Sequence, residues 1–541
     1  MIKSIQDKKA TWKSSILLLL FFNILFRLWV ALKPLPHIDG VTIPDDAYLS
    51  LTIARNIARG LGPLYGLDYT NGFQPLYVFL TVPIYWLFPG HPETAIYAAL
   101  ILLALFDTAT LYFLIKIVKS LSASGLTSFI MAISWIFNSY VLLTVANGLE
   151  TSIALFFVIA SFYFYLKTPF EIEFSKGLFR TFCLGALLGL ALLARIDNIF
   201  FAVAMIFYVW IQSSRISTSH KKALISVAAL ISGILFAYIP WLSYSYYFTG
   251  DLFPISGKAV SLISSPGTRS IAGLFDFYFG LFRKSAYIII KNNLPYIFAI
   301  LVGAFSLSIT RKPSVIRNMA RKLAVFLPLL LFGTALFCAY LIIFPVQWFF
   351  VRYYYPLILL FFIVASVVVD SFIVELPGRF VPYISGVLIA FFVITCTLRP
   401  LTRIIIYGNT DSGRGYLNIG YWARDNFEDN TIIGSAQTGA LGYLAGNLTV
   451  INLDGVVNRR AYDAMRQRRT IAYIKQSGIE YVLGWSINIV PIINESYNFS
   501  PGDLIFIKKI EYIKSWGYDW YLYRVGRDSL DIPGTNDILN D

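Results

Sequence analysis

Charged residues, cysteine and histidine are all scarce in this chain. Of its 541 residues 14% are charged and 57% are hydrophobic, whereas soluble globular proteins carry roughly 25% charged residues. This composition excludes an ordinary soluble protein and indicates a polytopic membrane protein. The three cysteines all lie inside apolar runs, which excludes a disulfide framework and a cysteine-based metal site. His37 and His91 are isolated residues near prolines, so we expect neither a histidine metal site nor a required cofactor.

The net charge of +14 reflects membrane topology rather than nucleic-acid binding. Lys and Arg accumulate in short loops between apolar runs, which is the pattern of cytoplasmic loops under the positive-inside rule. At the N-terminus, four lysines precede an apolar run that lacks a small-residue cleavage site. We therefore expect a retained first span and a cytoplasmic N-terminus.

Long apolar runs predict about eleven transmembrane helices within a module formed by residues 1–398. We find no internal repeat across them, which argues against a transporter built from inverted repeats. The predicted spans are residues 14–32, 93–115, 126–146, 151–166, 178–194, 199–212, 223–243, 286–310, 324–343, 356–373 and 381–398.

Residues 75–88, PLYVFLTVPIYWLF, are apolar but short. Fourteen residues containing Pro83 suit an interfacial helix better than a crossing of the ~30 Å hydrocarbon core. If the segment did cross, Lys116, Lys119 and every later basic cluster would face outward, against the positive-inside rule. We therefore place it in an outer loop, residues 33–92, that contains interfacial helices.

From residue 399 to residue 541 the composition becomes that of a soluble domain. Short β-rich runs such as TIIGSA and LTVINLDG alternate with helical patterns, which predicts a small α/β domain. The parity of the spans places this domain on the extracytoplasmic side. We expect it, including Tyr443 and Asp454, to help hold an acceptor.

The outer loop contains an adjacent pair of acids. Asp45 and Asp46 follow a proline and open a predicted helix that ends at Gly60. Carboxylates beside a bilayer are costly unless they are solvated or functional. Asp45 could instead cap the helix, so a structural role for it stays open.

The predicted topology brings further polar residues to the same face of the membrane. Cations there would bind a lipid-linked phosphate, and a carboxylate could act as a general base. Structural alternatives are open here too: an ion pair for Arg195 and Asp197, interface anchors for Arg27 and Arg352, a solvated acid at a helix start for Glu150 and a solvated loop lysine for Lys258. The converging residues are Asp45, Asp46, Glu150, Arg195, Asp197, Lys258 and Arg352, with Arg27 pointing toward them.

Several motifs resemble those of the GT-C membrane glycosyltransferases. The run DDAYLSLTIARNIARG resembles the first outer loop of bacterial relatives of protein mannosyltransferases and of aminoarabinose and arabinofuranosyl transferases. NGFQPLY, NGLETSIALFF, LLARIDNIF, GDLFPISGKA and VRYYYP resemble later family segments in the same order, so the resemblance covers most of the chain. Ile196 stands where the family often has proline, so the turn at Arg195 departs from the family pattern. The second outer loop lacks the Asp-x-Glu pair of oligosaccharyltransferases, which argues against en bloc glycan transfer and against a required metal.

The resemblance implies a polyprenyl-phosphate sugar as donor and Asp45 as the general base. Asp46 and Glu150 would be further catalytic residues. The implied substrate-binding residues are Arg27, Tyr48, Arg195, Asp197, Lys258 and Arg352.

Together these features predict an inverting glycosyltransferase of the bacterial plasma membrane. It would move one sugar to an acceptor hydroxyl of a glycan, lipid or protein on the extracytoplasmic side. The alternatives are a membrane transporter or lipid-linked sugar flippase, and a binding protein that has kept the fold without the chemistry. A flippase would need polar residues near the bilayer midplane, whereas here they gather at the ends of the spans.

Overall fold

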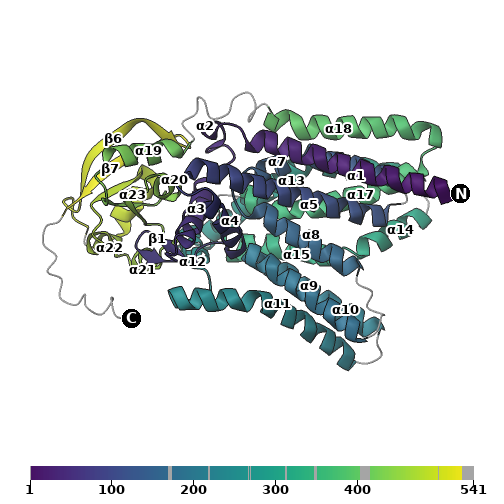
Figure 1. Ribbon diagram of the computed structural model, residues 1–541, viewed down its shortest axis with the longest axis horizontal. Helices are drawn as coiled ribbons and strands as arrows, with labels where there is room; N and C mark the ends of the chain where they lie inside the picture. The colour runs from purple at the N-terminus through teal and green to yellow at the C-terminus, as the bar shows by residue number, and fades with distance from the viewer. Residues whose placement is uncertain are drawn as a thin grey trace.

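The computed structural model consists of a bundle of long helices with an α/β domain at one end (Figure 1). It describes residues 2–526 except 123, 168–173, 217–219, 266, 268–269, 311–312, 347–349, 402–414 and 498. Cys183 and Cys338 are free, and the side chain of Cys396 lies outside the described residues.

The long helices run side by side along the bundle (Figure 1). Their apolar side chains form a continuous core that includes Trp135, Phe162 and Phe362. The helices are α1 (Ile2–Ala31), α5 (Pro92–Leu121), α6 (Gly125–Ile136), α7 (Ser139–Val145), α8 (Thr151–Lys167), α9 (Phe174–Ala194), α10 (Ile199–Ile216), α11 (His220–Thr249), α13 (Ile271–Thr310), α14 (Pro313–Ala324), α15 (Leu327–Cys338), α17 (Ile358–Glu375) and α18 (Val381–Leu401).

Eight helices of the described chain are long and apolar enough to cross a membrane, and ten if two bent pairs each form one span. The first pair is α6 with α7, bent by 55°, and the second joins α14 to α15 and the π-helix η2 (Ala339–Ile343), bent by 65°. The 17-residue α8 is apolar but shorter than these. The polytopic helical architecture is therefore confirmed, while the number of eleven spans stays a prediction.

A buried arginine holds the bend between α6 and α7. Carbonyls at a helix end lack partners within the helix, and inside a membrane no water replaces them. Arg27 donates from Nη2 to the carbonyl of Trp135 at 3.1 Å and from Nη1 to that of Ile136 at 2.7 Å. Its Nε pairs with Asp107 at 2.9 Å, and Asn138 caps the first amides of α7. Arg27 therefore stabilises a broken helix.

The loop of residues 33–92 folds into short elements at the end of the bundle. The predicted helix after Pro44 is confirmed as α3, and the 13-residue α4 packs beside α3 rather than among the long helices (Figure 1). Gly60 has a φ of +78°, a conformation that suits glycine and lets the chain turn after α3. The elements are α2 (Leu35–Ile38), α3 (Asp45–Ala58), β1 (Leu64–Tyr65), β2 (Asp68–Tyr69) and α4 (Pro75–Leu87).

The C-terminal region is an α/β fold, as predicted. Its five-stranded sheet has the order β4-β3-β5-β7-β6, with β3 parallel to β4 and β5 and with β7 antiparallel to β5 and β6. Residues 402–414 and 527–541 of the predicted domain lie outside the described residues. The elements are α19 (Leu417–Asn426), β3 (Ile432–Ser435), α20 (Gly439–Leu444), β4 (Thr449–Asn452), α21 (Arg459–Arg466), α22 (Thr470–Gln476), β5 (Tyr481–Trp485), α23 (Ser486–Glu495), β6 (Leu504–Ser515) and β7 (Tyr518–Val525).

Loop 33–92 and the C-terminal domain share one hydrophobic core. Tyr48, Tyr77 and Tyr85 of the loop belong to the same buried cluster as Tyr443 and Trp520 of the domain. Burying such rings removes large apolar areas from water. The domain is therefore packed onto the loop and does not hang from a linker.

The contact between α3 and α20 is so close that it requires a glycine. A Cβ on Gly439 would lie 1.9 Å from the backbone oxygen of Asp45, well inside van der Waals contact. Gly439 is the first residue of α20, so any side chain there would push α20 away from α3.

We predict that Gly439→Ala destabilises the chain. Moving α20 away from α3 costs about 1–3 kcal/mol by analogy with overpacked cores, and a lowered thermal unfolding midpoint in detergent would show it. Gly446→Ala is the matched control, because a Cβ at Gly446 meets nothing within 4 Å. Equal midpoints for the two variants would contradict this account of the contact.

Candidate active site

The adjacent acids of α3 have different surroundings. The Asp45 carboxylate is buried and accepts hydrogen bonds from the amides of Gly439 at 2.8 Å and Ala440 at 2.9 Å. These are the first amides of α20, whose own N-cap residue, Thr438, provides no side-chain bond. Asp45 therefore caps a helix of the C-terminal domain, and it makes no capping bond to α3 itself.

Arg55 completes the attachment at the other end of α20. Its Nη1 and Nη2 donate to the carbonyls of Tyr443 at 2.7 Å and Gly442 at 3.2 Å. Negative charge favours a helix N-terminus and positive charge a C-terminus, so Asp45 and Arg55 complement both ends of α20. We call this arrangement the α20 clamp.

A third carboxylate of the loop binds the next helix of the domain. Asp39 accepts bonds from the amides of Tyr416 at 2.6 Å and Leu417 at 2.8 Å, at the start of α19. Its other oxygen accepts from the Tyr48 hydroxyl at 2.8 Å. Asp39 was not singled out from the sequence, because its partners lie more than 370 residues away.

Burial makes the carboxylates at this contact weak acids. It raises the pKa of Asp45 to about 7 and that of Asp39 to about 6, against opposing backbone hydrogen bonds. Burial also raises the pKa of Asp454 to about 7, and the charge of Asp46 adds to the shift. Asp454 of the C-terminal domain therefore lies within electrostatic reach of the loop.

Asp46 turns away from the clamp toward two arginines at the end of the bundle. Its side chain is 38% exposed, and Oδ2 accepts from Nη1 of Arg352 at 3.1 Å. Nη2 of Arg352 donates to Glu150 Oε1 at 3.0 Å, and the same oxygen accepts from Arg195 at 2.8 Å. The structure thus joins three predicted site residues from separate loops, Asp46, Glu150 and Arg352, through one network.

Arg195 extends the network to Asp197 and two tyrosines. Its Nη2 lies 2.6 Å from Asp197 Oδ2, and the Tyr340 hydroxyl donates to that oxygen at 2.7 Å. The Tyr353 ring stacks on Tyr340 with centroids 4.6 Å apart. The guanidinium carbons of Arg195 and Arg352 lie 5.7 and 6.0 Å from the Tyr353 centroid. We call Asp46, Glu150, Arg195, Asp197, Tyr340, Arg352 and Tyr353 the acid–arginine cluster.

Two buried polar atoms of the acid–arginine cluster have no hydrogen-bond partner within the described chain. They are Glu150 Oε2 and Arg352 Nε. Buried polar atoms in proteins are nearly always paired, and exceptions often mark a functional site or a bound water or ion. Both atoms are buried, so they mark where a water molecule or a ligand group would complete the network beside the partly exposed Asp46.

The other predicted site residues lie outside the acid–arginine cluster. Arg27 is occupied at the α6–α7 bend, and Tyr48 is buried at the α20 clamp against Tyr443. Lys258 on α12 (Ile255–Ser264) is exposed and lies 3.4 Å from Asp251. None of these three side chains contacts the arginines of the cluster in the described chain.

Sequence reasoning missed Tyr340 and Tyr353. Tyr353 lies in the segment VRYYYP, which resembles a family segment as a whole without marking this tyrosine. Tyr340 lies in the π-helix η2, and single π turns often occur at functional sites although no simple sequence pattern marks them.

The described residues contain no group of three or more His, Cys, Asp or Glu side chains placed to hold a metal ion. The acid–arginine cluster instead pairs carboxylates with guanidinium groups, which bind phosphate bidentately. The absence of a required metal stays a prediction.

The fold is that of the GT-C glycosyltransferases, as predicted. Each of the three solved structures compared below matches at least 95% of this chain, so the likeness extends over the bundle and the C-terminal domain. At identities of 10–14%, the likeness establishes the fold alone.

ArnT from Cupriavidus metallidurans bound to undecaprenyl phosphate matches with a TM-score of 0.58 and 11% identity, over 95% of this chain and 98% of ArnT. The oligosaccharyltransferase AglB from Archaeoglobus fulgidus, in complex with an inhibitory peptide and a dolichol-phosphate, matches with 0.54 and 10%, over 98% of this chain and 75% of AglB. The arabinofuranosyltransferase AftD from Mycobacteria matches with 0.51 and 14%, over 97% of this chain and 40% of AftD.

By sequence, residues 405–533 match a family described as a domain of unknown function, DUF8728. No curated protein sequence matches the chain. The match covers the C-terminal domain and leaves out the acid–arginine cluster.

We predict that Asp45 makes stability depend on pH. Its pKa rises from 3.8 to about 7 on folding, so between about pH 4 and pH 7 the folded chain holds a proton that the unfolded chain has lost. The free energy of unfolding therefore falls as the pH rises across this window. Asp45→Asn should flatten that decline in thermal midpoints measured in detergent from pH 5 to pH 8.

Asp39 and Asp454 remain in the Asp45→Asn variant and supply the residual slope. Asp425→Asn is the matched control, because Asp425 is an exposed acid on α19. A pH slope in Asp45→Asn as steep as in the control would show that Asp45 does not titrate as its burial requires.

Proposed function

We propose that the chain is an inverting glycosyltransferase that moves one sugar from a polyprenyl-phosphate donor to an acceptor hydroxyl. The observation that carries the proposal is the acid–arginine cluster. It combines a partly exposed carboxylate with two arginines, and one of these, Arg352, has an unpartnered Nε. In such a set the guanidinium groups can bind a phosphate and the carboxylate can accept a proton.

The proposed phosphate ligands are Arg352 and, behind it, Arg195. Both are held in place by Glu150 and by Tyr353, so their guanidinium groups need little reorganisation on binding. Positive charge placed where the leaving phosphate develops negative charge stabilises the transition state.

The acceptor oxygen attacks the anomeric carbon from the side opposite the phosphate. The bond from that carbon to the phosphate oxygen breaks, and polyprenyl phosphate leaves with the bonding electrons. A carboxylate of the acid pair takes the proton of the acceptor hydroxyl. A single displacement inverts the anomeric configuration and needs no covalent enzyme intermediate.

We assign the base to Asp46, because Asp46 is the accessible acid of the pair. The resemblance to GT-C enzymes implies Asp45 instead. Both Asp45 oxygens accept amide hydrogen bonds from α20, so Asp45 could accept a proton from substrate only after α20 withdraws. In this proposal Asp45 positions the C-terminal domain above the site.

Two of the compared structures support a lipid-linked phosphate as ligand. ArnT was solved bound to undecaprenyl phosphate, and AglB in complex with a dolichol-phosphate. The apolar helices around the acid–arginine cluster suit a lipid tail. By the positive-inside rule, the cluster and the C-terminal domain face the extracytoplasmic side of a bacterial plasma membrane.

We predict that Asp46→Asn lowers transfer by about 10²–10⁴-fold, because an amide cannot act as a base. The purified chain is incubated with a total extract of the producing cell's envelope, which supplies both lipid-linked sugar donors and glycan, lipid and protein acceptors. Mass spectrometry then follows the conversion of polyprenyl-phosphate sugar to free polyprenyl phosphate. Asp425→Asn should match the wild type, and full activity in Asp46→Asn would contradict the assignment.

The variant Asp45→Asn distinguishes between Asp45 and Asp46 as the general base. If Asp45 only positions α20, the variant loses less activity than Asp46→Asn, and its thermal midpoint above pH 7 falls because one hydrogen-bond acceptor is lost. If Asp45→Asn instead loses as much transfer activity as Asp46→Asn while its thermal midpoint stays unchanged, Asp45 is the general base.

A further inference from the structure

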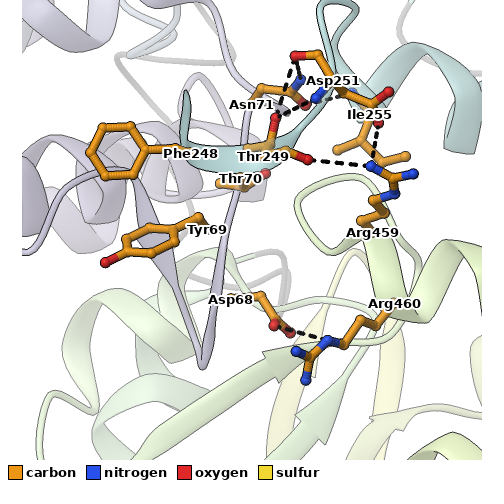
Figure 2. A pocket seen from close by; sticks show the side chains of 10 residues that line it. All are labelled: Asp68, Tyr69, Thr70, Asn71, Phe248, Thr249, Asp251, Ile255, Arg459 and Arg460. Atoms are coloured by element: carbon orange, nitrogen blue, oxygen red, sulfur yellow. Dashed lines mark hydrogen bonds and ion pairs between the residues drawn. The ribbon is translucent and has the colours of Figure 1, made fainter. Parts of the chain in front are cut away.

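A second polar site lies where loop 33–92, the end of α11 and the C-terminal domain meet. It is a cavity of about 240 Å³, open to one side. Figure 2 shows Tyr69 and Phe248 on one side, with Arg459 and Arg460 opposite. None of its lining residues belongs to the acid–arginine cluster.

The upper wall of the cavity is held rigidly by Asn71. This buried side chain donates to the Ser245 hydroxyl at 3.0 Å and to the carbonyl of Phe253 at 3.1 Å, and it accepts from the amide of Ile255 at 3.0 Å. The end of α11 and the segment that follows it are thereby fixed to loop 33–92 through one side chain. The cavity is therefore a preorganised site.

Two arginines and two aspartates line the cavity, so their formal charges cancel. Arg459 lies 3.0 Å from Asp251 Oδ2, and Arg460 lies 3.3 Å from Asp68 Oδ1. Each guanidinium keeps further N–H donors, and each carboxylate keeps acceptor capacity. A neutral ligand rich in hydroxyl groups can bond to these donors and acceptors together without displacing either pair.

Aromatic rings line the opposite side. Tyr69, 47% exposed, packs edge-on against Phe248 with centroids 5.0 Å apart, and Phe248 packs on Tyr244 at 4.7 Å. An apolar ring face beside a few fixed polar groups is typical of sites for small polar molecules. The volume lies below the ~300–1,000 Å³ of drug-sized sites, which leaves room for about one sugar ring.

A short stretch of the C-terminal domain links the cavity to the neighbourhood of the acid pair. Arg459 follows Asp454 by five residues, a separation of at most about 18 Å of extended chain. Asp454 is close enough to Asp46 for their charges to interact. A ligand longer than one sugar could therefore lie partly in the cavity and extend toward Asp46.

We propose that this cavity binds a neutral sugar unit of a glycan acceptor. The inference rests on the proposed transferase function and deepens it, because it selects a glycan as the acceptor class rather than a lipid or a protein. The planar groups of Arg459, Arg460, Asp68 and Asp251 bind the sugar hydroxyls, and Tyr69 and Phe248 cover an apolar face of the ring. The cavity thereby presents a hydroxyl of a neighbouring sugar to the acid pair.

The test measures binding without donor lipid. Saturation-transfer difference NMR of the full chain in detergent uses maltose, lactose, cellobiose and α-1,6-mannobiose as probes. We expect at least one disaccharide to give a signal that falls at least fivefold in Arg460→Ala and Tyr69→Ala. Arg466→Ala is the matched control, since Arg466 is an equally exposed arginine of α21 outside the cavity.

The Arg460 side chain is 65% exposed, so Arg460→Ala leaves the fold intact. The binding test therefore remains valid even if Tyr69→Ala unfolds. Three results would overturn the inference: no signal from any disaccharide, an unchanged signal in Arg460→Ala, or displacement of the sugar by inorganic phosphate. Because no turnover is measured, failure of the transferase proposal would leave the binding result standing. Conversely, if the chain consumes lipid-linked sugar but binds no disaccharide, the glycan-binding site is disproved while the transferase proposal stands.

Discussion

The attachment of α20 to α3 is the interaction on which the arrangement of the site depends. Asp45 binds the N-terminal amides of α20, and Arg55 binds its C-terminal carbonyls. The Arg55 bonds are charge-assisted, and those of Asp45 become so once its carboxyl group ionises near pH 7; such bonds are shorter and stronger than neutral ones. Because they are buried beside shared aromatic packing, the C-terminal domain has a fixed position over loop 33–92. That position places Asp454 within electrostatic reach of Asp46 and brings Arg459 and Arg460 to the wall of the cavity.

Adjacent residues explain how one short motif serves docking and, in the proposed mechanism, also supplies the base. Successive side chains of an α-helix point about 100° apart, since a turn contains 3.6 residues. Asp45 consequently turns toward α20, while Asp46 turns toward Arg352. In the proposed mechanism the docking of the domain and the positioning of the base are linked through the first turn of α3. A movement of α20 would therefore shift the first turn of α3 and, with it, the Asp46 carboxylate.

The sequence predicted the parts of this structure that depend on local patterns. The long helices follow from apolar runs, α3 from the acids after Pro44, and the α/β domain from short β-rich segments. Span parity also predicted that Asp46, Glu150, Arg195 and Arg352 would converge, and the structure joins them in one network.

What could not be predicted depends on partners distant in sequence. The roles of Asp39 and Arg55 require knowledge of helices more than 370 residues away. Arg27 was expected to point toward the site, but the carbonyls of Trp135 and Ile136 at the α6–α7 bend bind it inside the bundle. That bend leaves no clear mark in an apolar run. The π-helix that carries Tyr340 also lies within an apolar run, so no sequence pattern predicts it.

The most direct test of the central claim is native mass spectrometry of the chain extracted gently from its own membrane. The claim is that the acid–arginine cluster binds a lipid-linked phosphate. We predict a bound polyprenyl phosphate or polyprenyl-phosphate sugar in the wild type, and its loss in Arg352→Gln, which removes the guanidinium beside Asp46. A wild-type chain free of polyprenyl lipid, or undiminished lipid in Arg352→Gln, would contradict the account.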